Sequence, residues 1–327
     1  MSRLSRPALL TAAVSLTAGL VVAPGAAYAA DTATQLSAAQ MAAALKSVAT
    51  TSTAAAAPGW RATTGLSGQL SGSGLFVADP AGGVGFERFI SGGLMAAEYA
   101  VAGKGRYEYL GDPTARSAVK MMGRPAVKFV FTADKALNFD AYVKDAATSP
   151  ATVLTDDTDH AGTKTVHDDA PADYRFKADS TTVTIHVNPA GVLTSARATD
   201  DGVAVTLAYA YGPQHVTVPA ATATIGAAAL DQGITYLDMP TIVKQVARQG
   251  AADARKAAHG HKVKVASLRK VVRRDVAAAN KSLRLTMVKT KNTTNGVRVY
   301  ATNPWTHKTT AYTLKASGTK VVTTKNS

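Results

Sequence analysis

Apolar and polar residues alternate with a period of two through much of residues 61–211, which predicts a long antiparallel β-meander. In "TTVTIHV" and "VAVTLAYAY" the apolar side chains fall on one face and mostly polar or small ones on the other. The segments "NPAG" (188–191) and "TDDG" (199–202) separate these runs, and each matches a type I turn followed by a glycine in the left-handed conformation. We therefore expect a sheet that is covered on one side only.

Helical spacing precedes and interrupts this strand pattern. In "LSAAQMAAALKSVAT" Ser37 and Gln40 form a capping-box pair, and one face of the following helix carries Met41, Ala44, Leu45 and Val48. Shorter helices are predicted around 113–122 and 136–146, with a strand between them. The stretch 147–172 is rich in Asp, Thr and Pro and predicts mainly a long surface excursion, with room for one hairpin.

The pattern changes after residue 238. Asp238 is placed to begin a helix with Pro240 in its first turn. In the next helix, "ASLRKVVRRDVAAANK", one face carries Leu268, Val271, Val272, Val276 and Ala279. Three or four antiparallel strands follow, at "LRLTMVKT", "GVRVYATN", "TTAYTLKAS" and "TKVVTT". The sequence thus predicts an α+β protein with a large domain at 30–225, a linker at 226–238 and a smaller α+β domain at 239–327.

The first residues are typical of a secretory signal peptide. Arg3 and Arg6 precede an apolar run over 8–22, and the small residues Ala27 and Ala29 predict a signal peptide at 1–29 cleaved after Ala29. The apolar run is shorter than the roughly 20 residues of a spanning helix, which disfavours the alternative of a membrane anchor. The sequence has no cysteine, so it holds no disulfide, thiolate metal site or lipid-anchored cysteine. We expect a secreted, extracytoplasmic protein without a lipid anchor.

Charge separates the two predicted domains. The chain carries a net charge of +14, yet residues 1–238 hold 17 Lys and Arg against 20 Asp and Glu. Residues 239–327 hold 19 Lys and Arg against two acids, Asp253 and Asp275. Such an excess of one sign indicates an anionic partner for the second domain.

Three stretches of the first domain carry a resemblance to a known family. They are "GRYEYL" followed by "ARSAVKMMGRPAVKFVF", the hairpin "HVNPAGVLTSARA", and "LAYAYGPQHVTVPAA", in which a strand breaks at Gly-Pro and resumes as "VTVP". Over about residues 38–221 this pattern resembles the lipoprotein-carrier half-barrel family, which includes periplasmic lipoprotein carriers and mycobacterial-type lipid-transfer lipoproteins. The resemblance implies a curved antiparallel half-barrel with inserted helices. An unrelated antiparallel sheet with helices on one face is the alternative.

In that family the ligand lies between the curved sheet and the inserted helices, so the resemblance implies an apolar cavity here. The candidate lining residues are Leu75, Val77, Phe86, Phe89, Met95, Tyr99, Tyr107, Tyr109, Met121, Met122, Phe129 and Phe131. Methionine suits an adaptable wall because it is unbranched and polarizable. The alternative is that these side chains fill a solid core. The two-domain layout also resembles periplasmic regulators that bind an anti-sigma factor, although no residue is carried over from them.

The cations of the second domain gather before and within its second predicted helix. The candidate anion-binding residues are Lys262, Lys264, Arg269, Lys270, Arg273 and Arg274. A contact with an anionic membrane or wall polymer, or a patch that binds extracellular DNA, competes with the simpler interpretation of a solvated helix face. For an exported protein, genomic nucleic acid is not an expected partner.

Motifs for catalysis are absent from the sequence. It contains no Gly-x-Ser-x-Gly, P-loop, His-Glu-x-x-His or Rossmann glycine pattern. The acidic run "DDTDH" and the nearby His167 match no metal-site spacing, and Glu87, Glu98 and Glu108 are too scattered along the sequence to suggest a catalytic pair. We expect neither an enzyme nor a bound metal or cofactor.

Together these features favour a secreted, non-enzymatic carrier. The first domain would hold an acyl chain or another apolar ligand, and the second would dock on an anionic envelope surface. The alternative is an extracytoplasmic regulatory protein that binds a membrane-bound partner such as an anti-sigma factor. A third hypothesis is a structural protein that adheres to wall polymers.

Overall fold

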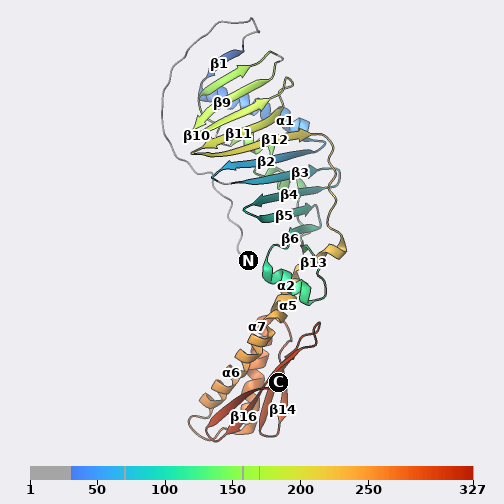
Figure 1. The fold of residues 1–327 in the computed structure, drawn as a ribbon, viewed down its shortest axis with the longest axis vertical. Coiled ribbons are helices and arrows are strands. Elements are labelled where there is room, and N and C mark those ends of the chain that lie inside the picture. Colours follow the sequence, from blue (N-terminus) through green and yellow to red (C-terminus); the bar gives the residue numbers. More distant parts are fainter. Residues whose placement is uncertain (1–30, 70, 157, 169, 327) are drawn as a thin grey trace. The chain divides into compact units, whose positions relative to one another are not determined.

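A computed structural model describes residues 31–69, 71–156, 158–168 and 170–326 (Figure 1). The fold is a mixed α+β fold with one large antiparallel sheet, one four-stranded sheet and helices, as the alternating pattern predicted. The chain divides into two compact units. The first is Met1–Tyr109 with Phe131–Pro219, and the second is Leu110–Val130 with Ala220–Ser327. The predicted signal peptide at 1–29 lies outside the described residues.

The sheet of the first unit runs in the order β1-β8-β9-β10-β11-β12-β2-β3-β4-β5-β6. Neighbouring strands are antiparallel, and β12 returns to pair with β2 from Tyr211 opposite Trp60 to Val203 opposite Gly68. The strands are β1 (Thr32–Leu36), β2 (Trp60–Gly68), β3 (Gly72–Asp79), β4 (Val84–Ser91), β5 (Leu94–Val101), β6 (Gly105–Tyr109), β7 (Phe129–Ala133), β8 (Gly162–Val166), β9 (Ala172–Ala178), β10 (Thr181–Val187), β11 (Leu193–Asp200) and β12 (Val203–Tyr211).

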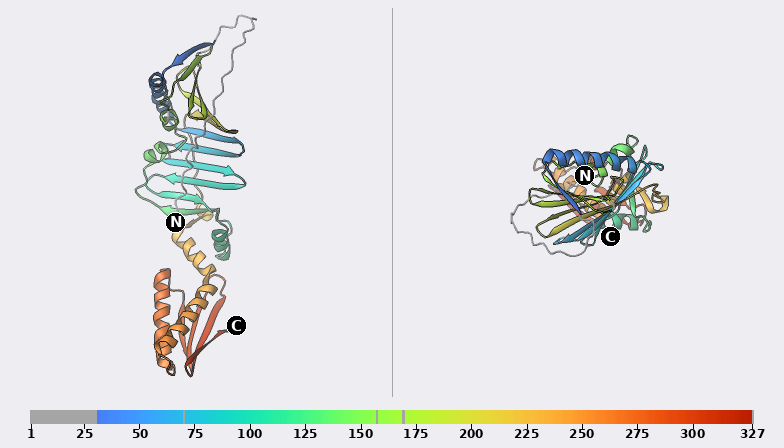
Figure 2. Two further views of the ribbon diagram at one scale, coloured as in Figure 1. Left: turned by 90° about the vertical axis from the view of Figure 1, so that its left-hand side faces the viewer. Right: turned by 90° about the horizontal axis from the view of Figure 1, so that it is seen from above.

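Helices cover one face of this sheet, as Figure 2 shows for α1 (Ala38–Ala56). The predicted capping box of Ser37 and Gln40 is present at its start. Its apolar face buries Met41 and Leu45 in a core with side chains of β9, β10 and β11. Because apolar residues recur at helical spacing on α1 and with period two on the strands, the two patterns meet in one core.

Two shorter helices complete the cover. The helix α3 (Phe139–Lys144) is shorter than the predicted 136–146 and places Tyr142 over the sheet. The stretch predicted as a surface excursion contains α4 (Pro150–Thr155) as well as β8. The prediction of a surface excursion was wrong for 150–155, because Ser149 caps α4, Pro150 fits its first turn, and Leu154 is fully buried. The one hairpin that it allowed is present, as β8 paired with β9.

The two hairpin turns differ from each other. At 188–191 Gly191 has φ 77° and donates to the Asn188 carbonyl, which agrees with the predicted turn. At 199–202 the prediction of a type I turn was wrong, since Asp200 and Val203 are paired and only two residues connect the strands. Asp201 and Gly202 both have positive φ, 38° and 79°, as a type I′ turn requires.

The second unit has two helical groups and a small sheet. A first core joins α2 (Pro113–Met121) to α5 (Ala227–Leu237) beside the short β13 (Thr224–Gly226), through buried residues such as Val119 and Leu230. The stretch predicted as a linker at 226–238 is therefore mostly helix. The helix was not predicted because the run of alanines at its start shows no amphipathic pattern.

The larger core of the second unit lies between two helices and four strands. The helices α6 (Met239–Ala257) and α7 (Val265–Leu283) pack on one face of a sheet ordered β14-β15-β16-β17 (Figure 2). Val243, Leu268, Val272, Val299 and Leu314 are fully buried between the layers. The strands are β14 (Lys289–Thr293), β15 (Gly296–Thr302), β16 (Thr309–Ser317) and β17 (Lys320–Asn326).

Candidate functional site

The apolar residues expected to line a cavity under the helices lie mostly on the opposite face of the sheet. Phe76 points toward α3, where its ring stacks on Tyr142 with centroids 6.0 Å apart. Alternation therefore directs Leu75 and Val77 to the outer face. The cross-strand register places the following expected residues on that outer face as well: Phe86, Met95, Tyr99, Tyr107 and Tyr109.

The remaining expected residues are divided among three places. The Phe131 ring lies 4.7 Å from that of Tyr107, and Phe129 precedes it at the same alternation on β7. Phe89 pairs with Gly74 on the helix side and is 39% exposed. Met121 and Met122 belong to the second unit, where Met122 packs in the core of α2 and α5. The twelve residues therefore do not line one hollow, because the alternation defines two faces without telling which one the helices cover.

The outer face instead forms a continuous aromatic and aliphatic row. Val77, Phe86, Tyr99 and Tyr107 are cross-strand neighbours on β3, β4, β5 and β6. The Phe86 and Tyr99 rings lie 4.5 Å apart, and each of the four side chains is half-buried. Burial raises the pKa of the Tyr99 hydroxyl, and Arg88 partly opposes this shift. The row offers an apolar surface rather than titratable chemistry.

A pocket of about 470 Å³ opens beside this row in the first unit. Its wall includes Tyr107, Lys104 and valines of β4 and β5, and the segment after the Gly-Pro break supplies residues 214–216 and Val218. Asp79 fixes that segment: it is 2% exposed and accepts the backbone N–H of Val216 at 3.1 Å and of Gly82 at 2.8 Å. Of the twelve expected residues, Tyr107 contributes to this pocket.

On the helix side, a row of carboxylates was missed in the sequence. Glu87 is paired with Glu98, and Glu98 with Glu108, on three successive strands. The inference that these glutamates are scattered was thus wrong, because two hairpins of similar length bring them into one cross-strand row. The spacing of ten or eleven residues between them was the available signal.

Positive charge and a buried phenol accompany this row. Arg106 donates to Glu98 at 2.8 Å and its guanidinium carbon lies 5.4 Å from the centre of the Tyr142 ring. The Tyr142 hydroxyl is buried and has no hydrogen-bond partner of ordinary geometry. Burial raises its pKa, and the charges of Glu98 and Glu87 raise it further. This tyrosine is therefore neutral at physiological pH.

Of the acidic and histidine-containing stretches, His167 forms ion pairs in the described structure. His167 contacts Asp31 at 3.0 Å and Asp173 at 3.3 Å, and Asp173 also accepts His186 Nδ1 at 2.6 Å. The His160 ring stacks on Phe176 with centroids 6.0 Å apart. Among the described residues, no group of three or more His, Asp or Glu is arranged to hold a metal ion.

The six expected anion-binding residues have different roles in the second unit. Arg269 donates to the carbonyls of Gly296 and Thr293 and so fixes the β14–β15 turn. Arg273 donates to the Asn292 side chain at 3.1 Å. The remaining lysines are exposed and are Lys262, Lys264 and Lys270.

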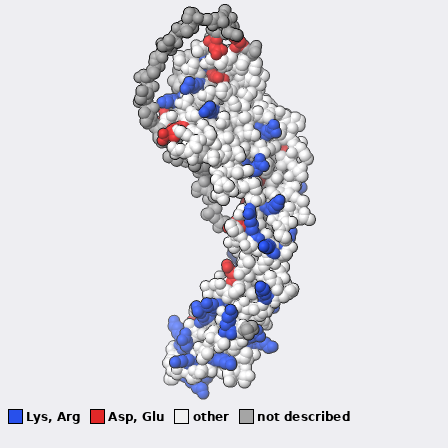
Figure 3. All heavy atoms as spheres, viewed as in Figure 1, with Lys and Arg blue, Asp and Glu red and all other residues white. Residues whose placement is uncertain are grey.

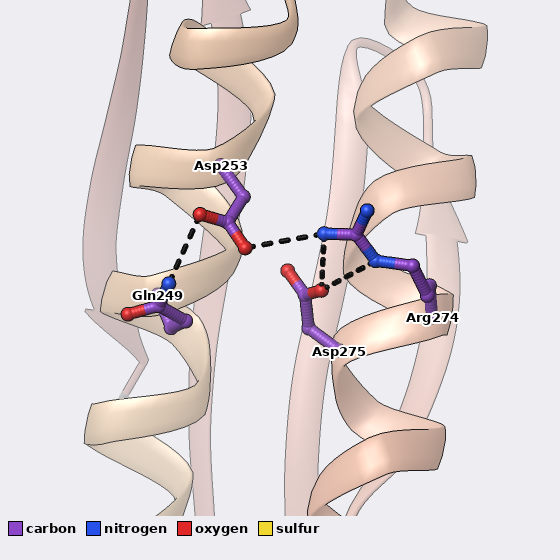
Figure 4. A network of polar contacts seen from close by, with 4 residues as sticks. All are labelled: Gln249, Asp253, Arg274 and Asp275. Atoms are coloured by element: carbon purple, nitrogen blue, oxygen red, sulfur yellow. Dashed lines mark hydrogen bonds and ion pairs between the residues drawn. The ribbon is translucent and has the colours of Figure 1, made fainter.

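Arg274 pairs with the acidic residues of the cation-rich segment 239–327 (Figure 4). It donates to Asp253 Oδ2 at 3.1 Å and to Asp275 Oδ1 at 2.8 Å, and Gln249 holds the other oxygen of Asp253. These are the two acidic residues of 239–327, and no other ion pair joins residues of this segment in the described part of the chain. Figure 3 shows Lys and Arg side chains gathered over the second unit.

No family model matches the chain, and no curated protein shows significant sequence similarity to it. Within the described residues, no helix combines the length and hydrophobicity needed to cross a bilayer.

Proposed function

We propose that this chain is a non-enzymatic binding protein of the cell envelope that docks on an anionic surface through its second unit. One observation carries this proposal. Both acids of 239–327 are held by a single arginine, Arg274, and among the described residues the other 18 Lys and Arg of the segment form no ion pair with a carboxylate. Cations near an anionic surface contribute roughly 1 kcal/mol each, so a minority of them suffices for attachment.

The test is the salt dependence of binding by the full-length mature protein. We expect it to sediment with isolated cell envelopes and with vesicles containing phosphatidylglycerol at low salt, and to be released as ionic strength rises toward 0.5 M, because the Debye length shortens from about 10 Å at 0.1 M. Vesicles of phosphatidylcholine alone are the neutral control. Equal binding to neutral vesicles, or binding that survives high salt, would contradict attachment by charge.

A second function is favoured by the outer face of the first unit. We propose that this unit is a lipoprotein-carrier-like half-barrel that holds an acyl chain or similar apolar ligand. The supporting observations are the half-buried row of Val77, Phe86, Tyr99 and Tyr107 and the neighbouring pocket of about 470 Å³. This location differs from the one the family resemblance implies, which is the hollow on the helix side.

Native mass spectrometry of protein purified from its own secreting host tests this second function. The expected result is a stoichiometric adduct that organic extraction removes and identifies as a lipid. A clean mass, with no uptake when fatty acid is offered, would show that the row and pocket hold no such ligand. The regulatory alternative predicts instead a salt-resistant complex with a membrane-bound protein partner and no lipid adduct.

A further inference from the structure

The sheet of the second unit has one covered and one open face. Val297, Val299 and Leu314 point toward α6 and α7 and are fully buried. Since side chains alternate along a strand, the residues between them point to the other face. No helix of the described chain packs on that open face, because the helix–sheet core involves the first set of side chains.

Each of the four strands contributes a cation to this open face. Arg298 of β15 lies directly opposite Lys291 of β14, and Lys315 of β16 lies opposite Gly296, one step further along the same face of β15. Lys320 of β17 pairs with Ser317, again one step further. With strands about 4.8 Å apart and same-face residues about 7 Å apart along a strand, these four cations form a diagonal line across the sheet. Lys289 adds a fifth charge beside Lys291.

Within the described residues, the cations on this face form no ion pair with a carboxylate. From Val276 to the end of the chain the sequence contains no Asp or Glu, so no strand of this sheet carries a carboxylate. Lys291 and Arg298 are like charges in direct cross-strand opposition, an arrangement that destabilises a sheet. The Arg298 Nε is buried without a hydrogen-bond partner, while its guanidinium carbon lies 5.5 Å from the centre of the Tyr300 ring. An anion at this point would relieve the repulsion.

The shape and chemistry of the face select among anionic ligands. A bilayer favours apolar side chains that enter it, but the open face offers Tyr300 and, on the edge strand, Val322. Sheets that bind nucleic acid stack two or three bases on aromatic rings, whereas here the single ring of Tyr300 already lies against Arg298. Lysines spaced along a line suit separate phosphate groups on a flexible chain, since each acts as a point charge.

We propose that the open face of β14–β17 binds a linear polyol-phosphate polymer, with its phosphates along Lys291, Arg298, Lys315 and Lys320. This inference rests on the proposed function and specifies both the surface and the ligand class. It places the contact on the sheet rather than on the Lys262, Lys264 and Lys270 group before and within α7.

Two triple variants of the full-length protein with equal charge test the location. The sheet variant carries Lys289→Gln, Lys291→Gln and Lys315→Gln, and the matched control carries Lys262→Gln, Lys264→Gln and Lys270→Gln. Lys320 is left unchanged because the β16–β17 turn touches the control segment, where the Val263 N–H donates to the Gly318 carbonyl. All six lysines are exposed, so both variants are expected to fold, which circular dichroism verifies.

The probe is synthetic poly(glycerol phosphate), titrated at several salt concentrations. We expect the sheet variant to lose affinity by at least about 30-fold, because two proposed phosphate contacts, at Lys291 and Lys315, are removed. The salt-dependence slope should become smaller by about 1.4, since each lost phosphate contact lowers it by roughly 0.7. The control variant should change less than about fivefold. Equal losses would mean that net charge alone matters, and a larger loss in the control would place the site at α7. Either result overturns the proposed surface.

Two further arms test the ligand class at equal phosphate concentration. A thymidine oligonucleotide and phosphatidylglycerol vesicles should both bind more weakly than the polymer to the unaltered protein. Tighter binding of the oligonucleotide or of the vesicles overturns the polyol-phosphate assignment and leaves the proposed anionic docking intact. Absence of binding to every anionic probe overturns the proposed function itself, so the two failures are distinguishable.

Discussion

Asp79 shows how one buried carboxylate positions the segment that follows the Gly-Pro break. Its two oxygens accept the N–H groups of Gly82 and Val216, so residues 214–218 lie along the pocket instead of leaving the sheet. The sequence predicted the break, but the strand expected to resume at "VTVP" does not form, since β12 ends at Tyr211 and residues 213–220 are neither strand nor helix. The sequence also showed no sign of this anchor. Asp79 lies 137 residues before Val216, and nothing in the local pattern distinguishes it from the other strand-end acids.

We expect Asp79→Ala to destabilise the first unit by about 1 to 3 kcal/mol, because the N–H groups of Gly82 and Val216 both lose the acceptor that the buried Asp79 side chain provides. Asp79→Asn retains one acceptor and should cost less. Urea unfolding followed by the fluorescence of buried Trp60 measures both. A loss below about 0.5 kcal/mol for Asp79→Ala, the range of ordinary surface substitutions, would show that the anchor is dispensable.

His167 makes the edge of the first unit sensitive to pH. Hydrogen bonds to Asp31 and then to Asp173 raise its pKa above the ordinary value of 6.5, while Asp173 is shared with His186. Because the pKa of His167 is higher in the folded protein than in the unfolded chain, the stabilisation from its contacts with the two aspartates is fully present below pH 6.5. It is lost as the pH rises through the pKa of His167 in the folded protein. Asp31 directly precedes β1, so this contact fastens the start of the edge strand.

A proton NMR titration of the histidine ring resonances checks this expectation. The midpoint of His167, assigned with His167→Gln, should lie above 6.5, and Asp31→Asn should lower it because the largest contribution is removed. A midpoint at 6.5 that does not respond to Asp31→Asn would contradict the contact in solution.

At the scale of elements, the sequence indicated the periodicity of helices and strands well, but it did not indicate which face of the sheet the helices cover. The α1 helix follows its capping box and its apolar face, and β10–β12 follow their alternation. The expected binding residues do not lie together on the helix side of the sheet, for a different reason. Phe86 and Tyr99 alternate with Glu87 and Glu98, and only the position of α3 decides which set is covered. Short elements such as α4 were missed because six residues are too few for a helical period to emerge.

Gly85 determines how closely α3 approaches the sheet. A Cβ atom at this position would lie 2.4 Å from the Tyr142 ring, so Gly85→Ala must push the ring and its helix away. We expect a destabilisation of about 1 to 3 kcal/mol in urea unfolding. Gly65→Ala on the same sheet is the matched control, since its nearest neighbour would be the Thr206 hydroxyl at 3.7 Å. Equal effects of the two substitutions would argue against a specific contact at Tyr142.

At the scale of the whole molecule, separate cores predict separate unfolding. The chain contains two tryptophans, and they report on different units: Trp60 lies in the first unit, and Trp305 in the second, where its ring meets Tyr236 edge-on at 5.3 Å. Charge asymmetry placed a division near residue 238, but it gave no sign that 110–130 would belong with the later residues. That association depends on apolar contacts between α2 and α5, which composition does not reveal.

Fully buried leucines provide the test. In chains with Trp305→Phe or Trp60→Phe, we expect Leu193→Ala to lower the urea midpoint reported by Trp60, and Leu314→Ala the one reported by Trp305. Each substitution should cost about 2 to 5 kcal/mol within its own unit. A common shift of both probes would show that the units unfold as one cooperative body.

The two outer strands of the four-stranded sheet have a consequence for self-association. The unpaired N–H and C=O groups of an edge strand are templates for strand addition between molecules. Here β14 carries Lys289 and Lys291, and β17 carries Lys320 and Lys325, so both edges repel a second copy of the same chain. The protein should therefore remain dispersed at high concentration, and neutralising these lysines should let the sheets of different molecules join edge to edge.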